Sequence, residues 1–265
     1  MSFIKRAIRK IINITAKTCK RIYFTFFKPK VVCNICGCKD YKFNSDDWHP
    51  NTICPNCRSQ VRQRLFVAIL QHVEEFSLNK LIKDKKLLHF APDNSLSKIL
   101  KSNAETYQTA DLFAEGYHYP DIDYNIDMSD MKIIKDETYD CVLAFDVLEH
   151  IPNHLEAIKE THRILKTDGC CVFTVPQKDN LEKTIEDLTI TDPKEREIKF
   201  GQWDHWRIYG NDFENMMTDN GFRVFVMDES EIDKHLVDKH VLFPPVLSKH
   251  PLATNYRKIY FGIKE

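Results

Sequence analysis

Acidic and histidine side chains follow an almost wholly apolar run near the middle of the chain. The run Cys141–Phe145 predicts a strand that is buried on both faces, and Asp146, Glu149 and His150 come directly after it. Such a strand suits the middle of a parallel sheet, where ligands bind beyond the carboxyl ends of the strands. Carboxylates and an imidazole at that edge can assist the removal of a proton from a bound hydroxyl. The sequence therefore predicts a ligand site there.

A second group of functional side chains lies between two glycines, in residues 201–210. Asp204 and His205 are candidate catalytic residues together with His150, and His205 is the preferred general base. Aromatic faces stack on sugar rings, and an arginine binds a phosphate or carboxylate with two hydrogen bonds. The residues expected to contact an acceptor are Trp203, Trp206, Arg207 and Tyr209. In the alternative interpretation these aromatic residues belong to the core and His205 has a structural partner.

Two Cys-x-x-Cys pairs, separated by seventeen residues, predict a metal site. Each pair lets two thiolates converge from one tight turn, and four thiolates complete a tetrahedral zinc site with no position for water. The zinc is therefore expected to be structural and to stabilise a small ribbon without a core of its own. The predicted ligands are Cys33, Cys36, Cys54 and Cys57. Cys38 and His49 lie close enough in the chain to replace one of them.

Charge is distributed unevenly along the 265 residues. Residues 1–30 carry nine Lys or Arg and no Asp or Glu, which leaves 29 basic and 39 acidic residues in the remainder. The apolar residues of segment 1–30 follow a helical stripe, which predicts a basic amphipathic helix. This helix either lies on an anionic membrane surface or packs on the domain. The acidic remainder argues against a nucleic-acid partner, which would need a cationic surface.

The cysteine pattern and the start of the chain also indicate the compartment. Four of the nine cysteines have metal-site spacing, and the N-terminus has no signal-peptide pattern, which together favour a reducing environment. We expect a cytoplasmic protein, which residues 1–28 would hold at the inner face of the membrane if they bind lipid.

Strand and helix patterns alternate from Lys85 onward, which predicts an α/β fold with a doubly wound, Rossmann-like sheet. The expected strands are Lys86–Phe90, Thr106–Ala110, Cys141–Phe145, Cys170–Val175, Phe222–Met227 and Lys258–Ile263. Helices are expected at Leu65–Phe76, Leu96–Ser102 and His154–Leu165. We divide the chain into the basic helix (1–30), the zinc ribbon (31–60) and an α/β domain (61–265), with an acceptor-binding insertion at 179–212.

Several motifs indicate the protein family to which the chain is similar. The stretches CPNCRSQVRQRLF, LLHFAPD, TADL, YDCVLAFDVLEHIP and ITDPKEREIKFGQWDHWRIYG resemble a subfamily of class I S-adenosylmethionine (SAM)-dependent methyltransferases over residues 33–262. In that subfamily HFAPD or HFAPE replaces the usual glycine-rich loop, and an N-terminal ribbon holds zinc. Many of its members are encoded with cell-surface glycan genes.

The resemblance implies a SAM site at the ends of the first strands. Asp111 would accept hydrogen bonds from both ribose hydroxyls, and Asp127 and Met128 would hold the adenine. His89 stands where the wider family has an acidic residue, and Ala91 and Asp93 stand at glycine positions. Asp146 completes the predicted cofactor residues.

The resemblance also implies a reaction. We expect O-methylation of a sugar or another small polar acceptor in the assembly of cell-surface glycans. The alternatives are an RNA methyltransferase with a zinc ribbon, for which Arg58, Arg62 and Arg64 would contact RNA, and a methyltransferase fold without activity.

Overall fold

The computed structural model of the chain describes residues 28–112 and 122–265. The helices are α2 (Val61–His72), α3 (Leu78–Leu81), α4 (Asn94–Asn103), α5 (His154–Ile164), α6 (Pro193–Phe200), α7 (Phe213–Thr218) and α8 (Lys234–His240), with 3-10 turns η1 (Leu148–His150) and η2 (Glu229–Glu231). The strands are β1 (Val31–Val32), β2 (Lys39–Asp40), β3 (Lys86–Phe90), β4 (Thr106–Asp111), β5 (Tyr124–Asn125), β6 (Tyr139–Phe145), β7 (Leu165–Thr174), β8 (Ile185–Glu186), β9 (Arg207–Ile208), β10 (Phe222–Met227) and β11 (Ile259–Lys264).

A seven-stranded sheet forms the centre of the molecule, in the order β10-β11-β7-β6-β3-β4-β5. The strands from β5 to β7 pair in parallel, whereas β11 runs antiparallel to both of its neighbours. Sequence order reverses between β3 and β6, so ligands are expected at the carboxyl ends of these two strands. The predicted doubly wound, Rossmann-like sheet is confirmed.

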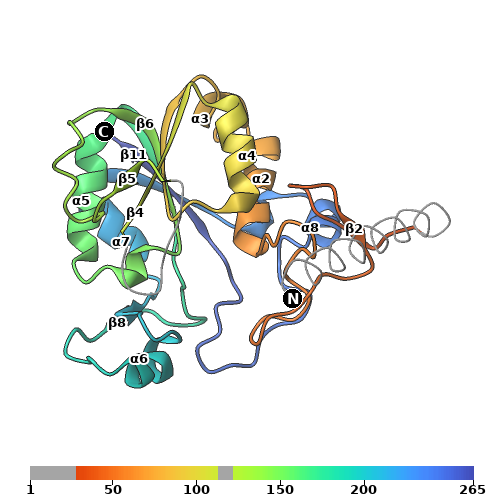
Figure 1. Cartoon of the computed structure of the whole chain (residues 1–265). Helices are drawn as coiled ribbons and strands as arrows, with labels where there is room; N and C mark the ends of the chain where they lie inside the picture. Colours follow the sequence, from red (N-terminus) through yellow and green to blue (C-terminus); the bar gives the residue numbers. More distant parts are fainter. Residues whose placement is uncertain (1–27, 113–121) are drawn as a thin grey trace, which may run out of the picture.

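Strand β6 is central because both of its faces are apolar. Cys141, Leu143 and Phe145 belong to one core cluster, and Val142 and Ala144 belong to the other. Successive side chains of a strand point to opposite faces, so the apolar run that marked this strand in the sequence fills both cores. Figure 1 shows α5 and α7 on one face of the sheet and α2, α3 and α4 on the other.

The predicted elements differ from the observed ones mainly at their ends. Strands β3 and β10 have the predicted bounds, but β7 begins at Leu165, five residues before the expected start. Helix α5 therefore ends at Ile164, and the Asp168–Gly169 pair lies within β7. Asp168 there has a φ of 60°, typical of a tight turn or bulge.

The predicted basic helix falls almost wholly on residues 1–27, which lie outside the described part of the chain. No helix within residues 28–112 and 122–265 has the length and apolar character needed to cross a bilayer. The membrane contact of the N-terminal segment stays a prediction.

Helix α6, in the insertion between β7 and β10, begins and ends with defined local signals. Asp192 caps α6 by accepting a hydrogen bond from the Lys194 amide at 2.7 Å, and Pro193 occupies the first helical turn. Gly201 ends the helix with a φ of 95°, a conformation that favours glycine. Strands β8 and β9 pair with each other, and this small unit lies beyond one end of the main sheet (Figure 1).

Candidate cofactor and acceptor cavities

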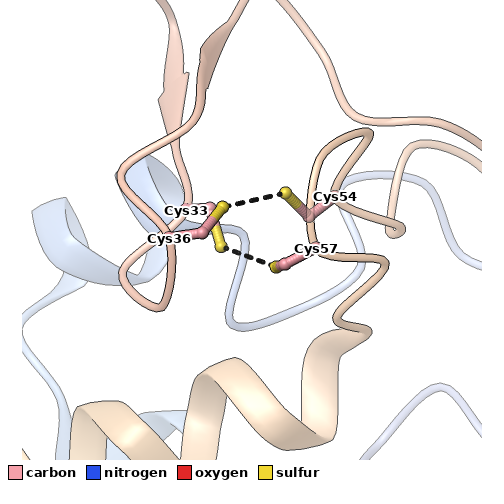
Figure 2. A group of neighbouring side chains, drawn as sticks. All are labelled: Cys33, Cys36, Cys54 and Cys57. Atoms are coloured by element: carbon pink, nitrogen blue, oxygen red, sulfur yellow. Dashed lines mark hydrogen bonds between the residues drawn. The ribbon is translucent and has the colours of Figure 1, made fainter. Parts of the chain in front are cut away.

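The four predicted zinc ligands come together at the ribbon. Their side chains point toward one another from two loops (Figure 2), and all four sulfur atoms lie within 4.8 Å of one another. The Sγ atoms of Cys33 and Cys57 are 3.7 Å apart, and those of Cys36 and Cys54 are 3.6 Å apart. With Zn–S bonds of about 2.3 Å, the edges of a tetrahedral site measure about 3.8 Å. The quartet therefore fits zinc, and neither Cys38 nor His49 belongs to it.

Arg64 joins the ribbon to the α/β domain. Its side chain is fully buried and donates hydrogen bonds to the backbone carbonyls of Ser59, Thr52, His240 and Val241 at 2.5 to 2.8 Å. Burial lowers the pKa of Arg64 to about 10, which leaves it charged at neutral pH. The guanidinium can therefore offset the negative charge of the nearby thiolates. Arg64 acts within the protein and is not available to RNA.

A cavity of about 660 Å³ lies beyond the carboxyl ends of the parallel strands. Its wall contains residues that follow β3, β4, β5 and β6, as well as residues of the insertion. This is the position at which an open α/β sheet binds its ligand. The predicted cofactor residues that line this cavity are Ala91, Asp93, Asp111, Asp127, Met128 and Asp146.

The loop after β3 reaches its shape without glycine. Ala91 adopts a φ of 45°, the left-handed region in which glycine is the usual residue. Asp93 caps α4 through the Ser95 amide at 2.6 Å and accepts a second hydrogen bond from the Gln63 side chain at 2.6 Å. The carboxylate of Asp93 thus shapes the loop, and part of its hydrogen-bonding capacity is already used.

His89 does not line the cavity. Its ring is fully buried, and Nδ1 lies 2.9 Å from the Tyr107 hydroxyl. Burial lowers the pKa of His89 to about 4, so the ring is neutral at physiological pH. The prediction that His89 contacts the cofactor does not fit this position, because the side chain packs behind the loop.

Asp111 has a free hydrogen-bond acceptor at the cavity. One carboxylate oxygen accepts a hydrogen bond from the Leu112 amide at 2.8 Å, while the buried Oδ2 atom has no hydrogen-bond partner among the described residues. A buried oxygen of this kind is unfavourable unless a ligand supplies donors. Burial raises the pKa of Asp111. The position fits a pair of ribose hydroxyls and therefore the SAM nucleoside.

Segments that are distant in the chain surround a second cavity, of about 480 Å³. Among its lining residues, Trp48 comes from the ribbon, Gly201 and His205 come from the insertion, and others come from the C-terminal segment 244–257. The Trp48 ring stacks on His250 with centroids 3.9 Å apart, and a Cβ atom on Gly201 would lie 2.9 Å from the Trp48 ring. The ribbon thus forms part of the cavity wall, a role that its cysteine spacing does not indicate.

The two cavities meet at Asp146, Arg62 and His150, which line both. Asp146 accepts hydrogen bonds from the Thr174 hydroxyl and from the Arg257 guanidinium, each at 2.7 Å, and Arg62 approaches it to 3.2 Å. Although burial alone would raise it, the two arginines hold the pKa of Asp146 well below its usual range. A carboxylate therefore persists at the junction.

Two predicted catalytic histidines meet beside this junction. The rings of His150 and His205 lie edge to face with centroids 4.7 Å apart, and Asp204 lies 2.9 Å from Nδ1 of His150. Although burial opposes it, the hydrogen bond with Asp204 raises the pKa of His150, whereas burial lowers that of His205 to about 4. Burial and the charge of Asp146 raise the pKa of the neighbouring Glu149 to about 7.

Arg207 and Tyr209, which we predicted to bind the acceptor, lie in the interior instead. Arg207 is fully buried, pairs with Glu186 and donates hydrogen bonds to three backbone carbonyls of the 148–152 turn at 2.6 to 2.8 Å. The Tyr209 hydroxyl lies 2.9 Å from Nδ1 of His154, within the core. The core interpretation is therefore correct for Tyr209, and Arg207 holds the insertion against the turn after β6.

The two tryptophans that were predicted to contact the acceptor lie at the other cavity. Trp203 and Trp206 line the larger cavity and not the smaller one. The Arg196 guanidinium stacks on the Trp206 ring at 3.4 Å from its centroid. The insertion therefore closes one side of the cofactor cavity while its His205 faces the other cavity.

Sequence reasoning missed two residues that line the smaller cavity. Arg257 belongs to no motif, and Trp48 was not distinguished within the ribbon. Glu149 was among the polar residues expected at the ligand site after β6, yet nothing in the sequence indicated that only 1% of it would be exposed. Contacts between distant segments determine the positions of all three.

Known proteins resemble parts of this chain. Residues 71–226, more than half of the chain, match the family model of a methyltransferase domain. An uncharacterized protein from Methanocaldococcus jannaschii is 49% identical over 49 residues, which are 18% of this chain and about a fifth (21%) of that relative's length.

Several solved structures are similar to this chain at low sequence identity. A SAM-dependent methyltransferase from Mesorhizobium loti is 12% identical, with 74% of this chain and 100% of that chain covered and a TM-score of 0.48. A 1,6-didemethyltoxoflavin N1-methyltransferase from Burkholderia thailandensis, solved with S-adenosylhomocysteine, is 9% identical, with coverage of 77% and 78% and a TM-score of 0.47. The extent of the family-model match carries the assignment: this chain belongs to the methyltransferase domain family.

Proposed function

We propose that the protein is a SAM-dependent O-methyltransferase that acts on a sugar or another small polar acceptor. The observation that carries the proposal is the unpartnered buried oxygen of Asp111, a residue that lines a cavity at the ends of the parallel strands. A second, polar cavity adjoins the first at Asp146 and His150. Two adjoining cavities suit a reaction between two bound substrates.

The larger cavity has the features that SAM binding requires. Asp111 would accept hydrogen bonds from the ribose hydroxyls, and the buried Met128 would contact the adenine. Trp203 and Trp206 close the cavity on the side of the insertion and help to exclude water. When bound, SAM supplies a methyl group that its sulfonium has already activated. The protein's task is to align an acceptor oxygen with that methyl group.

The smaller cavity has the features that a sugar-like acceptor requires. Trp48 offers an aromatic face, while Arg62, Arg257 and His205 offer hydrogen-bonding groups. His205 and His150 lie close enough to the junction to receive a hydroxyl proton, with Asp204 orienting His150. The resemblance to methyltransferases encoded with glycan genes supports a role in cell-surface glycan assembly.

The alternative of an RNA methyltransferase has less support. Arg64 is buried in the attachment of the ribbon, and Arg62 pairs with Asp146 inside the cavities. Of the three arginines in that cluster, only Arg58 has no such internal salt bridge or carbonyl network among the described contacts. The acidic composition after residue 30 also disfavours an RNA surface.

A calorimetric titration with SAM tests the cofactor, and a transfer assay tests the acceptor. We expect micromolar SAM binding, and transfer of labelled methyl groups to components of a nucleotide-sugar or capsule extract but not to total RNA. Absence of SAM binding would favour an inactive scaffold. Salt-sensitive binding and methylation of RNA would favour the alternative.

A further inference from the structure

Three potential metal ligands gather where the smaller cavity meets the larger one. Glu149, His150 and His205 each offer a ligand atom, and these atoms lie within 4.8 Å of one another. Nε2 of His150 lies 3.9 Å from a carboxylate oxygen of Glu149. All three residues line the smaller cavity. The group is separate from the four cysteines of the ribbon.

Both imidazole rings have a hydrogen-bond acceptor at Nδ1. Nδ1 of His205 lies 3.2 Å from the Phe200 carbonyl, which can only accept, so Nδ1 carries the proton. Nδ1 of His150 lies 2.9 Å from the Asp204 carboxylate, which assigns the proton in the same way. In the neutral form of each ring, Nε2 then carries the lone pair that a metal ion would need. Histidines that ligate a metal are typically held in this manner by a carbonyl or a carboxylate.

Glu149 provides a second, independent indication of a bound cation. The residue is 1% exposed, and its Oε2 atom has no hydrogen-bond partner among the described residues. A buried carboxylate oxygen without a donor is unfavourable, and coordination to a cation removes that cost. The adjacent Asp146 cannot serve this purpose, because Arg257 and Thr174 already bind its carboxylate.

We propose that Glu149, His150 and His205 bind a divalent transition-metal cation. Two imidazole nitrogens and one carboxylate oxygen suit Mn²⁺, Fe²⁺, Co²⁺ or Zn²⁺ better than Ca²⁺, which prefers oxygen ligands only. Opposite ligands of an octahedral ion at about 2.1 Å stand about 4.2 Å apart, so small side-chain rotations bring this group into range. Three protein ligands leave further coordination positions open toward the cavity.

The open positions define the class of acceptor, an inference that rests on the proposed methyltransferase function. Two adjacent oxygen atoms, as in a vicinal diol, can chelate the cation, which lowers the pKa of the coordinated hydroxyl. That hydroxyl loses its proton to solvent water and not to His150 or His205, because both imidazoles then ligate the cation. Its oxygen then forms a bond to the methyl carbon, the carbon–sulfur bond breaks, and the electron pair goes to sulfur, leaving a neutral thioether. The metal thus directs methylation to one hydroxyl of a diol.

Mn²⁺ binding to the full-length, zinc-loaded protein tests the site without any acceptor. We expect one Mn²⁺ per chain by electron paramagnetic resonance titration, with spin-echo modulation from two histidine nitrogens. Glu149→Gln and His205→Phe should each weaken Mn²⁺ binding at least tenfold. His49→Gln, in the same cavity but outside the group, should leave it unchanged. Zinc content, measured before and after, shows that the ribbon is intact.

Each outcome bears on the proposal. Lack of stoichiometric Mn²⁺ binding at millimolar concentration, or Mn²⁺ binding without nitrogen modulation, overturns the site. The spectrum of the unmutated protein gives this result even if a variant does not fold. A SAM titration on the same samples separates the two proposals: SAM binding without Mn²⁺ binding refutes the metal site alone, and the reverse refutes the cofactor assignment alone.

Discussion

His150 and His205 lie edge to face with ring centroids 4.7 Å apart, although one follows β6 and the other belongs to the insertion. Arg207 explains how they meet, because its guanidinium donates hydrogen bonds to the carbonyls of Leu148, Ile151 and Pro152. The backbone amide of Trp206 adds a bond to the Glu149 carbonyl at 3.0 Å. Residues 206 and 207 of the insertion are therefore attached to the turn after β6 on both sides of His150.

Replacing Arg207 should destabilise this attachment. In Arg207→Met, three buried carbonyls and Glu186 lose a charged donor, and removal of one partner of a buried ionic network costs about 3–5 kcal/mol. We expect a loss of that order in the free energy of unfolding, measured by urea denaturation, and faster amide exchange in residues 146–152. Arg223→Met, at an exposed pair with Glu265, is the control and should change stability by no more than about 0.5 kcal/mol. Equal stability of the two variants would contradict the assigned role.

Replacing Asp111 should weaken cofactor binding. Hydrogen bonds to a charged group contribute about 1.5–3 kcal/mol, so Asp111→Ala should raise the SAM dissociation constant by about 10- to 100-fold in a calorimetric titration. Asp219→Ala, at an exposed carboxylate after α7, should leave the SAM affinity unchanged. If SAM binds both variants equally well, Asp111 does not hold the ribose.

Replacing one ribbon cysteine should release the zinc. Cys54→Ser removes one of four thiolates, and because the ribbon has little core of its own, it should unfold locally. We expect less than stoichiometric zinc by mass spectrometry of the metal content, together with a changed fluorescence of Trp48. Cys38→Ser, in the same ribbon but outside the quartet, should keep one zinc per chain. Zinc that persists in Cys54→Ser would count against the four-cysteine site.

Burial of His89 should make stability depend on pH. Its pKa falls from an ordinary value of 6.5 to about 4 in the folded chain, so the unfolded chain binds the proton more tightly. The free energy of unfolding should therefore fall as the pH drops from about 6.5 to 4, by up to about 3 kcal/mol, and His89 should contribute no slope above pH 7.

Two variants isolate this contribution. His89→Asn keeps a polar contact with Tyr107 but does not titrate, so urea denaturation at pH 4.5 and pH 7 should show a smaller difference than in the unmutated protein. His154, whose pKa burial also lowers, retains part of the slope. His72→Asn on the exposed face of α2 should preserve the full difference. An unchanged slope in His89→Asn would show that His89 is not responsible.

Local patterns in the chain were enough to predict the sheet and the cysteine quartet. Successive side chains of β6 point to opposite faces of the sheet, so an apolar run at this position fills both cores. The spacing within each Cys-x-x-Cys turn is enough to present two thiolates. The polar residues after β4 and β6 were likewise predictable, because the carboxyl ends of parallel strands share one edge.

Only the tertiary structure determined which side chains around the two cavities line a cavity and which are buried hydrogen-bond donors. Arg207 and Arg64 are both cations in polar stretches of sequence, yet both are buried donors to backbone carbonyls. Trp48 reaches the smaller cavity because the ribbon packs against Gly201 and the C-terminal segment. Each of these roles depends on contacts between residues far apart in the chain. Spacing and residue type, which describe only near neighbours, contain no information about such contacts.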